Sequence, residues 1–393
     1  MRRLERVCWS IVVASLGCAS STPSFADGAR ARTLGIPFDG TPGRFNAITD
    51  IQGVTVGYTT LIEGAGKQAV RTGVTAILPR GKATTMKPVF AGVFSLNGNG
   101  EMTGAHWIEE SGFLEGPVLV TNTHSVGVVR DAAIQWRVKQ GEPDASGYWW
   151  SLPVVAETWD GDLNDINGFH VKTEHVFAAL DNAHDGAIEE GNVGGGTGMT
   201  CHEFKCGTGT SSRVVKIDER DYHLGVLVQA NYGVRSELRI AGVPVGKVLQ
   251  NDLTRSEPKD VGSIIIVIAT DAPLLPTQLK RLARRASLGL ARNGSYSGDG
   301  SGDIFIAFST ANEAANQVAT TSITALGNEQ MDPLFLATVQ AVEESIINAM
   351  IAAETMTGYD GHKAVAIDHR ALLKLLKEHK ALLENKPEKK SAH

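Results

Sequence analysis

The sequence predicts an α/β or layered α+β fold from three observations. Short runs rich in β-branched residues recur along the chain, helical apolar patterns lie between them, and glycine is frequent, at 43 of 393 residues. The glycine excess indicates many tight turns and close backbone approaches. The strand-like runs cover residues 54–56, 75–78, 118–121, 224–228 and 263–270. The last run is continuous and β-branched, so we expect a strand that is buried on both faces.

Three helices are predicted from apolar spacing and end signals. One covers residues 276–292 and is ended by Gly294. A second begins at Asp332, which we expect to be its N-cap, and keeps helical spacing until Gly358 ends it. Asp368 is expected to cap a last, basic helix that contains the leucines at 372, 375, 376, 382 and 383. The basic side of this helix is interpreted as a solvated surface.

The composition excludes several classes of protein. Apolar residues make up 42% and charged residues 20% of the chain, which is ordinary for a globular protein and excludes a disordered chain, a coiled coil or a polytopic membrane protein. The net charge of -6 provides no basic surface for nucleic acid. We therefore expect chemistry on a small molecule or a peptide, with no nucleic-acid partner.

The N-terminus has the pattern of a secretory signal peptide. Arginines at positions 2, 3 and 6 precede an apolar run over 7–19, and Ser24-Phe25-Ala26 forms a small-x-small cleavage site. The apolar run is too short to span a membrane. Residues 1–26 are therefore predicted to be removed, which gives a periplasmic or secreted protein without a membrane span.

Two cysteines remain after residues 1–26 are removed. Cys201 and Cys206 could form a disulfide in an exported protein, or they could bind zinc together with His202. A disulfide across so short a loop would stabilise the fold little by chain entropy, and a zinc site needs three or four ligands. We favour a third interpretation, two ordinary thiols.

Three glycine-rich segments invite a phosphate-binding interpretation. They cover residues 191–199, 207–213 and 296–303. A phosphate loop needs a strand before it and a helix directly after it, and the residues that follow 191–199 are not helical in pattern. The third segment precedes a strand predicted over 304–308. We therefore do not expect a nucleotide cofactor.

The Gly262-Ser263 pair has the features that a self-cleaving N-terminal nucleophile requires. Ser263 begins the buried strand, Gly262 offers an unhindered carbonyl, and a charged loop over 255–260 precedes them. No Gly-x-Ser-x-Gly elbow fits a strand–turn–helix context, and no His-Glu-x-x-His sequence occurs. By pattern alone, a simple turn before a strand explains the pair equally well.

A wider resemblance distinguishes these interpretations. From the mature start to about residue 360, the chain resembles the β-peptidyl aminopeptidase / L-aminopeptidase–D-esterase family of N-terminal-nucleophile-like serine hydrolases. The matching segments are spread along the chain, at residues 46–50, 53–57, 71–75, 97–101, 121–127, 153–158, 191–199, 204–205, 207–213, 228–231, 263–273 and 301–303. So many separate matches are not due to chance.

The resemblance implies a fold, a processing event and an assembly. The fold is a four-layered α/β-β-α sandwich of the Ntn-hydrolase kind. The precursor cuts itself between Gly262 and Ser263, which gives an α-chain of residues 27–262 and a β-chain of residues 263–393. Family members assemble into tetramers, so a homo-oligomer of αβ units is expected, and neither a metal nor an organic cofactor is implied.

The resemblance also assigns roles to individual residues. Ser263 matches the nucleophile, and Ser301 and Asp303 match the serine and the acid that orient and polarise it. Asn231 matches the amide donor of the oxyanion hole, and Glu157 matches the carboxylate that holds the substrate amine. The implied substrates are short peptides, amino-acid amides and esters with a free N-terminus. The preference among β-, L-α- and D-residues is left open.

This chain departs from the family pattern at three positions. Asp303 stands where some members have glutamate, which shortens the side chain by one methylene. Cys206 replaces a usual glycine. Trp159 stands where others have tyrosine or leucine, and we expect it to line the substrate pocket and to affect substrate preference.

Two other functions remain as alternatives. One is an acyltransferase of the ornithine acetyltransferase type, against which the absence of an acyl-donor signature argues. The other is a glycine-rich ligand-binding protein without catalysis, whose chain would stay uncleaved.

Overall fold

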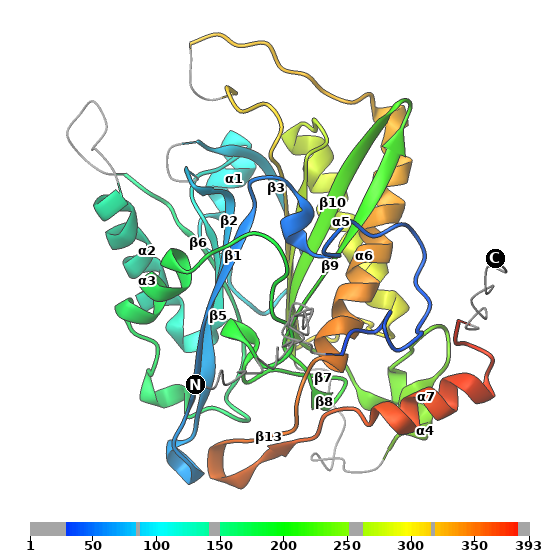
Figure 1. Ribbon diagram of the computed structural model, residues 1–393. Coiled ribbons are helices and arrows are strands. Elements are labelled where there is room, and N and C mark those ends of the chain that lie inside the picture. The colour runs from blue at the N-terminus through cyan, green and yellow to red at the C-terminus, as the bar shows by residue number, and fades with distance from the viewer. Residues whose placement is uncertain (1–28, 84–86, 141–149, 251–261, 316–318, 384–393) are drawn as a thin grey trace, which may run out of the picture.

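Two β-sheets lie at the centre of the molecule, between layers of helices (Figure 1). The computed structural model describes residues 29–83, 87–140, 150–250, 262–315 and 319–383. Within these residues the first sheet has four strands, in the order β1 (Thr55–Glu63), β2 (Val70–Lys82), β5 (Val118–Asn122) and β6 (Val154–Thr158). The second has six, in the order β4 (Phe113–Leu114), β3 (Val89–Gly98), β12 (Gly302–Ser309), β11 (Ser263–Thr270), β10 (Arg220–Asn231) and β9 (Thr208–Ile217).

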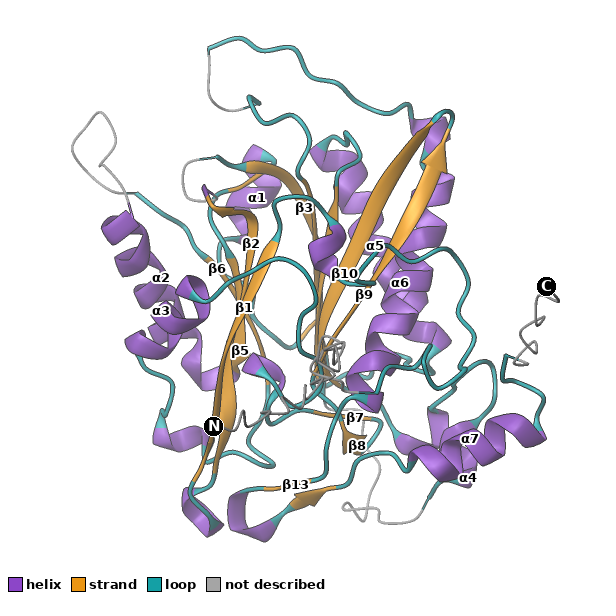
Figure 2. Ribbon diagram, viewed as in Figure 1, coloured by secondary structure: helices purple, strands orange, loops and turns teal. Residues whose placement is uncertain are grey.

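Helices cover the outer face of each sheet (Figure 2). The six-stranded sheet is covered by α5 (Pro276–Arg292) and α6 (Asp332–Ile351), and the four-stranded sheet by α2 (Val126–Gln140) and α3 (Thr173–Asp181). The smaller elements are α1 (Ala105–Ser111), α4 (Val245–Val248), α7 (His369–Glu378), and the paired short strands β7 (Thr200–Cys201) with β8 (Phe204–Lys205) and β13 (Met356–Thr357) with β14 (Lys363–Ala364).

The apolar core is divided by these layers, and β11 contributes to two parts of it. Ile265 and Val267 pack between the sheets, against residues of the four-stranded sheet such as Val120. Ile266 and Ile268 point the other way and pack in the cluster that includes α5 and α6. All eight residues of β11 are buried. The prediction of a strand buried on both faces is therefore confirmed, because successive side chains of a strand point to opposite faces.

The strand order brings the ends of three neighbouring strands together at one end of the six-stranded sheet. β11 runs antiparallel to β10 and parallel to β12. The start of β11 therefore lies between the end of β10 and the start of β12. These three positions carry the predicted residues Ser263, Asn231 and Asp303.

Several predicted elements match the structure closely. The bounds of β11 and α5 are those expected from the sequence, and Gly294 follows α5 with a positive φ of 102°. The glycine segment 191–199 contains one short 3-10 turn, Gly194–Gly196, and is followed by the strand β7 rather than by a helix. This confirms the prediction that no helix directly follows the segment.

The two ends of α6 differ from the prediction. Asp332 is the first residue of the helix rather than its N-cap, because a 3-10 turn runs directly into the helix through Met331. The helix ends at Ile351, well before Gly358. Tertiary contacts explain the early end, because a side chain of the glycine segment, Asn192 Nδ2, donates to Glu354 O at 2.8 Å and holds the chain outside helical geometry.

The last helix is shorter than predicted. Asp368 caps α7 through its side chain, which accepts from the N–H groups of Arg370 and Ala371, as expected. The helix ends at Glu378, so Leu382 and Leu383 lie outside it. The backbone turns here because Lys380 adopts a left-handed angle, with φ 55°, and Ala381 N donates back to Leu376 O at 2.8 Å. Leu383 N then donates to Gly35 O at 3.0 Å.

Some predictions cannot be compared with the structure. The predicted signal peptide, the charged loop 255–260 and the last ten residues lie outside the described residues. In the part of the chain that is described, one helical stretch, Asn328–Ile351, is long and apolar enough to cross a membrane, and most of it is buried in the core.

Candidate active site

Asn231 and Ser263 lie opposite each other where two neighbouring inner strands of the six-stranded sheet, β10 and β11, end and begin. They form the terminal pair in the antiparallel register of β10 and β11. Side chains of such a pair project to the same face with Cβ atoms about 4.5–5.5 Å apart. Both residues are buried, with exposed fractions of 8% and 6%. The strand register thus places an amide and a hydroxyl side by side in a buried position.

The start of β12 supplies the next groups. The backbone N–H of Gly302 donates to Ser263 Oγ at 3.1 Å. On either side of Gly302, Ser301 Oγ donates to Asp303 Oδ2 at 2.9 Å, and both side chains are buried. Asn97 Nδ2 donates to Ser301 Oγ at 3.1 Å. The structure therefore brings Ser263, Ser301 and Asp303 together, with a backbone group making the hydrogen bond to the Ser263 hydroxyl.

Gly262 lies directly against the end of β10. A Cβ added at Gly262 would clash with the carbonyl oxygen of Asn231 and would lie 2.7 Å from Tyr232 Cα. Only glycine fits so close to another backbone. The carbonyl before Ser263 is therefore held within the same small region as the Asn231 amide.

The Asn231 amide is held in one orientation by two backbone groups. Its Oδ1 accepts from Thr200 N at 3.0 Å, and its Nδ2 donates to Trp159 O at 2.8 Å. Because an N–H group occupies the oxygen end, the other end must be the NH2 group, which has a second hydrogen to donate. The arrangement can therefore present an N–H donor beside Ser263.

Glu157 is a buried carboxylate near the end of β6, with an exposed fraction of 4%. Its Oε1 accepts from the backbone N–H of Glu101 at 3.0 Å, and its Oε2 accepts from Thr123 Oγ1. Burial raises the pKa of Glu157, and these two hydrogen bonds offset part of that rise. A Cβ added at Gly100 would lie 3.2 Å from Glu157 Oε1 and 3.1 Å from Gly302 Cα. Gly100 therefore lies between Glu157 and Gly302 at the start of β12.

Trp159 belongs to a group of three partly exposed rings. Its exposed fraction is 42%, and its ring meets the edge of the His124 ring with centroids 5.6 Å apart. Phe169 stacks on the His124 ring, with ring centroids 6.0 Å apart. Neither His124 nor Phe169 was expected from the sequence to belong to the site. The only signal was the position of His124 within the matching segment 121–127.

Asp160 follows Trp159 and is fully buried. Its Oδ1 accepts from Asn164 Nδ2 at 3.0 Å. Burial raises the pKa of Asp160 to about 7, against smaller opposing effects of hydrogen bonds from Thr72, Asn164 and Asn122. Sequence reasoning also missed Asp160, Thr123 and Thr200, because an isolated polar residue carries no local signal of burial.

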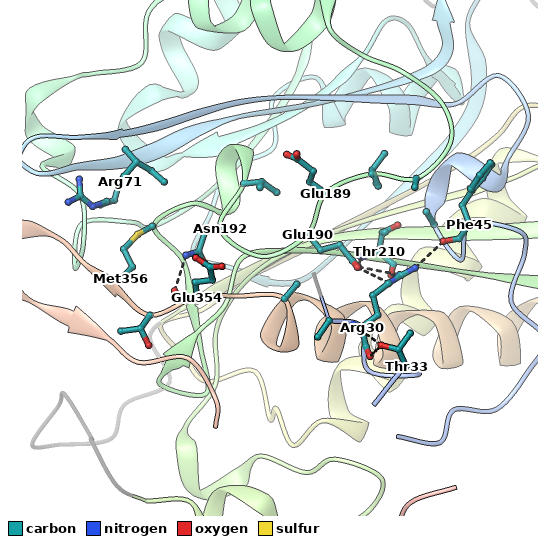
Figure 3. A pocket seen from close by; sticks show the side chains of 18 of the residues that line it. Arg30, Thr33, Phe45, Arg71, Glu189, Glu190, Asn192, Thr210, Glu354 and Met356 are labelled. Atoms are coloured by element: carbon teal, nitrogen blue, oxygen red, sulfur yellow. Dashed lines mark hydrogen bonds and ion pairs between the residues drawn. The ribbon is translucent and has the colours of Figure 1, made fainter. Parts of the chain in front are cut away.

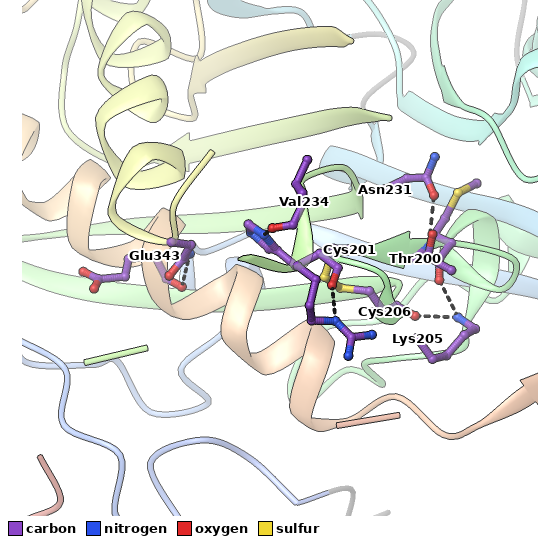
Figure 4. Close-up of a disulfide and its surroundings, with 11 residues drawn as sticks. Thr200, Cys201, Lys205, Cys206, Asn231, Val234 and Glu343 are labelled. Carbon is purple, nitrogen blue, oxygen red and sulfur yellow. Dashed lines mark hydrogen bonds between the residues drawn. A yellow bond between two sulfur atoms is a disulfide. The ribbon is translucent and has the colours of Figure 1, made fainter. Parts of the chain in front are cut away.

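Cys201 and Cys206 form a disulfide, so the prediction of two ordinary thiols is wrong (Figure 4). The short hairpin of β7 and β8 explains the pairing. His202 and Glu203 adopt left-handed backbone angles at its turn, and the returning strand brings Cys206 to a Cα–Cα distance of 5.3 Å from Cys201. Such a separation suits a disulfide. The bridge also removes both sulfurs as zinc ligands.

A separate cavity of about 1050 Å³ lies elsewhere on the molecule (Figure 3). Its lining is of mixed charge and includes Arg30, Arg71, Glu189, Glu190 and Asn192. Arg30 Nε pairs with Glu190 Oε2 at 2.8 Å. The predicted site residues at positions 157, 159, 231, 263, 301 and 303 are not in this lining.

Comparison with known proteins gives consistent results over nearly the whole chain. The sequence model of "Peptidase family S58" matches residues 46–364. The chain is 51% identical over 378 residues to the beta-peptidyl aminopeptidase BapA of Sphingosinicella microcystinivorans, covering 91% of this chain and 94% of that protein. It is 46% identical over 395 residues to the BapA protein of Sphingosinicella xenopeptidilytica, covering 96% and 98%.

A solved structure extends this similarity to the fold. The L-aminopeptidase D-Ala-esterase/amidase of Ochrobactrum anthropi superposes with a TM-score of 0.85 at 50% identity, covering 90% of this chain and 99% of that one. It is described as a prototype of the serine aminopeptidases and a variant of the Ntn hydrolase fold. Together with the layers described above, this confirms the predicted four-layered, Ntn-hydrolase-like sandwich.

Proposed function

Because this chain belongs to peptidase family S58 and is a serine-type aminopeptidase, we propose that it cleaves itself before Ser263 and then uses Ser263 to release N-terminal residues from short peptides. The observation that carries the proposal is the register of β10 and β11. It places the hydroxyl of Ser263, the amide of Asn231 and the backbone of Gly262 in one buried region.

The first step is the self-cleavage. Ser263 Oγ attacks the carbonyl carbon of Gly262, and its proton passes to the Ser263 nitrogen as the C–N bond breaks. The resulting ester is hydrolysed by water, which leaves a carboxylate on Gly262 and a free α-amine on Ser263. The close approach of Gly262 to Asn231 supports this step, because fixed positions of reacting groups replace the entropy of a bimolecular encounter.

The second step is turnover on a substrate. A serine hydroxyl becomes a good nucleophile only when a base removes its proton. The new α-amine of Ser263 has a reference pKa of roughly 7.7–8.0, so it can act as that base near neutral pH. Ser263 Oγ attacks the substrate carbonyl, the amine leaves with the transferred proton, and water releases the acyl group.

Two neighbouring elements support the nucleophile and the oxyanion. The remaining Nδ2 hydrogen of Asn231 is the proposed oxyanion donor, and such a donor contributes roughly 10²–10³ in rate. The Gly302 N–H donates to Ser263 Oγ and holds it in place. The hydrogen-bonded pair of Ser301 and Asp303 is proposed to polarise the Ser263 hydroxyl. In this proposal Ser301 and Asp303 orient Ser263 rather than bond to the substrate.

Glu157 is the proposed binding group for the substrate amine. A cation taken out of water without an anionic partner costs several kcal/mol, so a free N-terminus needs a carboxylate in the pocket. Trp159 adds a cation–π surface and lines the space for the first side chain. Pairing with Glu157 fixes the first residue against Ser263 and makes the enzyme an exopeptidase.

The proposed substrates are short peptides, amides and esters with a free N-terminal β-, L-α- or D-residue, as the names of the relatives suggest. The signal-peptide pattern over residues 1–26 is the sequence feature that supports the proposed export to the periplasm or beyond. A homo-oligomer of αβ units, of the tetrameric kind implied by the family resemblance, is the proposed assembly.

The test is a comparison of matched p-nitroanilides. Free-amine β-alanyl, L-alanyl and D-alanyl p-nitroanilides are assayed beside their N-acetylated forms, with Ser263→Ala as the inactive control. We expect turnover of at least one free-amine substrate and little turnover of the acetylated forms. Equal rates on free and acetylated substrates would contradict the role of Glu157, and full activity in Ser263→Ala would contradict the nucleophile.

A further inference from the structure

Lys205 is a fully buried lysine that the proposed mechanism does not use. It lies in β8, and its Nζ donates to Met199 O at 2.8 Å and to Cys206 O at 2.6 Å. Among the residues that the structure describes, no carboxylate forms a salt bridge with Lys205. Burying an amine without an anionic partner costs free energy, and the two carbonyl hydrogen bonds of Lys205 offset part of that cost.

One of these contacts leads directly to Asn231. The carbonyl of Met199 and the N–H of Thr200 belong to the same peptide group. Its oxygen accepts from Lys205 Nζ, and its N–H donates to Asn231 Oδ1 at 3.0 Å. Because the peptide group is planar, fixing the direction of the carbonyl also fixes the direction of the N–H. A single rigid unit therefore connects Lys205 to the amide beside Ser263 (Figure 4).

The disulfide holds the two ends of this connection together. Cys201 follows Thr200 within β7, and Cys206 comes directly after Lys205, the last residue of β8. The Cys201–Cys206 bridge thus fixes the strand that carries the Asn231 contact to the strand that carries Lys205. The Cys206 N–H also donates to Met199 O, at 3.1 Å.

We propose that Lys205 is a positioning residue for the oxyanion donor: it orients the Met199–Thr200 peptide group, which in turn orients the Asn231 side chain, and the disulfide keeps the two strands in place. The proposal rests on the function proposed above for Asn231. Burial lowers the pKa of Lys205 to about 7. A neutral amine has two hydrogens, which match the two carbonyl acceptors.

The test is a double-mutant cycle between Lys205 and Asn231. Lys205→Met removes the donor and keeps a similar apolar stem. In the wild-type background we expect kcat to fall at least tenfold with KM changed less than twofold, because Glu157 still binds the substrate amine. In an Asn231→Ala background we expect less than a twofold further loss, because the group that Lys205 positions is gone. For variants that mature slowly, the rate of self-cleavage replaces kcat.

Reduction of the disulfide in the mature wild-type enzyme provides a second test, which does not depend on how a variant folds. Dithiothreitol converts the disulfide into two thiols and is itself oxidised to its cyclic disulfide. We expect kcat to fall several-fold at constant KM and to recover on reoxidation, whereas a Cys201→Ala/Cys206→Ala variant does not respond to the reductant.

The outcomes separate this inference from the proposed function. Wild-type protein that turns over no free-amine substrate would overturn the proposed function. Active wild-type enzyme with unchanged kcat in Lys205→Met, or with equal losses in both backgrounds, would overturn only the role of Lys205. Unchanged kcat on full reduction would overturn the part played by the disulfide.

Discussion

Asn231 and Ser263 are the last cross-strand pair of β10 and β11, and the Asn231 amide is held from behind by Thr200 N and Trp159 O. The position of the amide relative to the hydroxyl is therefore set by strand register and by two backbone groups, rather than by a flexible loop. This relationship explains how a buried serine can have an oriented N–H donor beside it before any substrate binds.

Asn231→Ala should lower kcat by roughly 10²–10³, which corresponds to about 2.7–4 kcal/mol of transition-state stabilisation. KM should change little, because the substrate amine still has Glu157. The measurement is steady-state turnover of a free-amine p-nitroanilide, with the exposed Asn182→Ala as the matched control. A loss that appears only in KM would contradict an oxyanion role.

Gly262→Ala should block or strongly slow self-cleavage, because the new Cβ would clash with Asn231 O. The chain must then move away from β10, and the scissile carbonyl moves with it. Denaturing gels over time give the fraction cleaved. Gly127→Ala is the matched control, since a Cβ there meets nothing within 4 Å. Normal processing of Gly262→Ala would show that this contact is not needed.

Glu157→Gln should lower kcat/KM for free-amine substrates at least tenfold, or about 1.4 kcal/mol. The substituted amide keeps the shape but loses the negative charge. In the wild type, burial raises the pKa of Glu157, so the same loss should appear as pH falls through that raised value and the carboxylate is protonated. A pH profile of kcat/KM checks both points. A profile that is the same in wild type and Glu157→Gln on the acid side would contradict them.

Asp160→Asn should change how stability depends on pH. The folded-state pKa of Asp160 is raised to about 7, whereas the unfolded value is about 3.8. Between these values the folded state binds more protons, so the contribution of Asp160 to stability is complete below about pH 4 and is lost as pH rises towards 7. The variant lacks this loss, so its melting temperature relative to wild type should rise over that window. Asp185→Asn, at an exposed position, is the control. A difference that stays constant with pH would contradict the burial effect.

The sequence predicted elements well where the signals are local. The continuous β-branched run gave both ends of β11, and the Asn-Gly pair gave the end of α5. The C-terminal end of α6 was wrong because a contact with a distant segment, Asn192 with Glu354, decides it. The end of α7 was wrong because Lys380 adopts a left-handed backbone angle, for which a lysine gives no sequence signal.

The site was predictable only in part. The resemblance placed Ser263, Ser301, Asp303, Asn231 and Glu157 together in one site, and the structure brings them to one region. Their partners could not be predicted, because most are backbone atoms far away in the chain, such as Thr200 N and Trp159 O for Asn231. The disulfide was missed because the short separation of Cys201 and Cys206 in sequence does not reveal the β7–β8 hairpin that brings the two residues together.

The most direct test of the account is an intact-mass spectrum of the purified protein, with N-terminal sequencing of each chain. Self-cleavage by Ser263 predicts two chains, the second beginning Ser263-Ile264-Ile265, and a single uncleaved chain for Ser263→Ala. A wild-type protein that remains one full-length chain, or a Ser263→Ala protein that still splits before position 263, would contradict the claim that Ser263 is a self-generated N-terminal nucleophile.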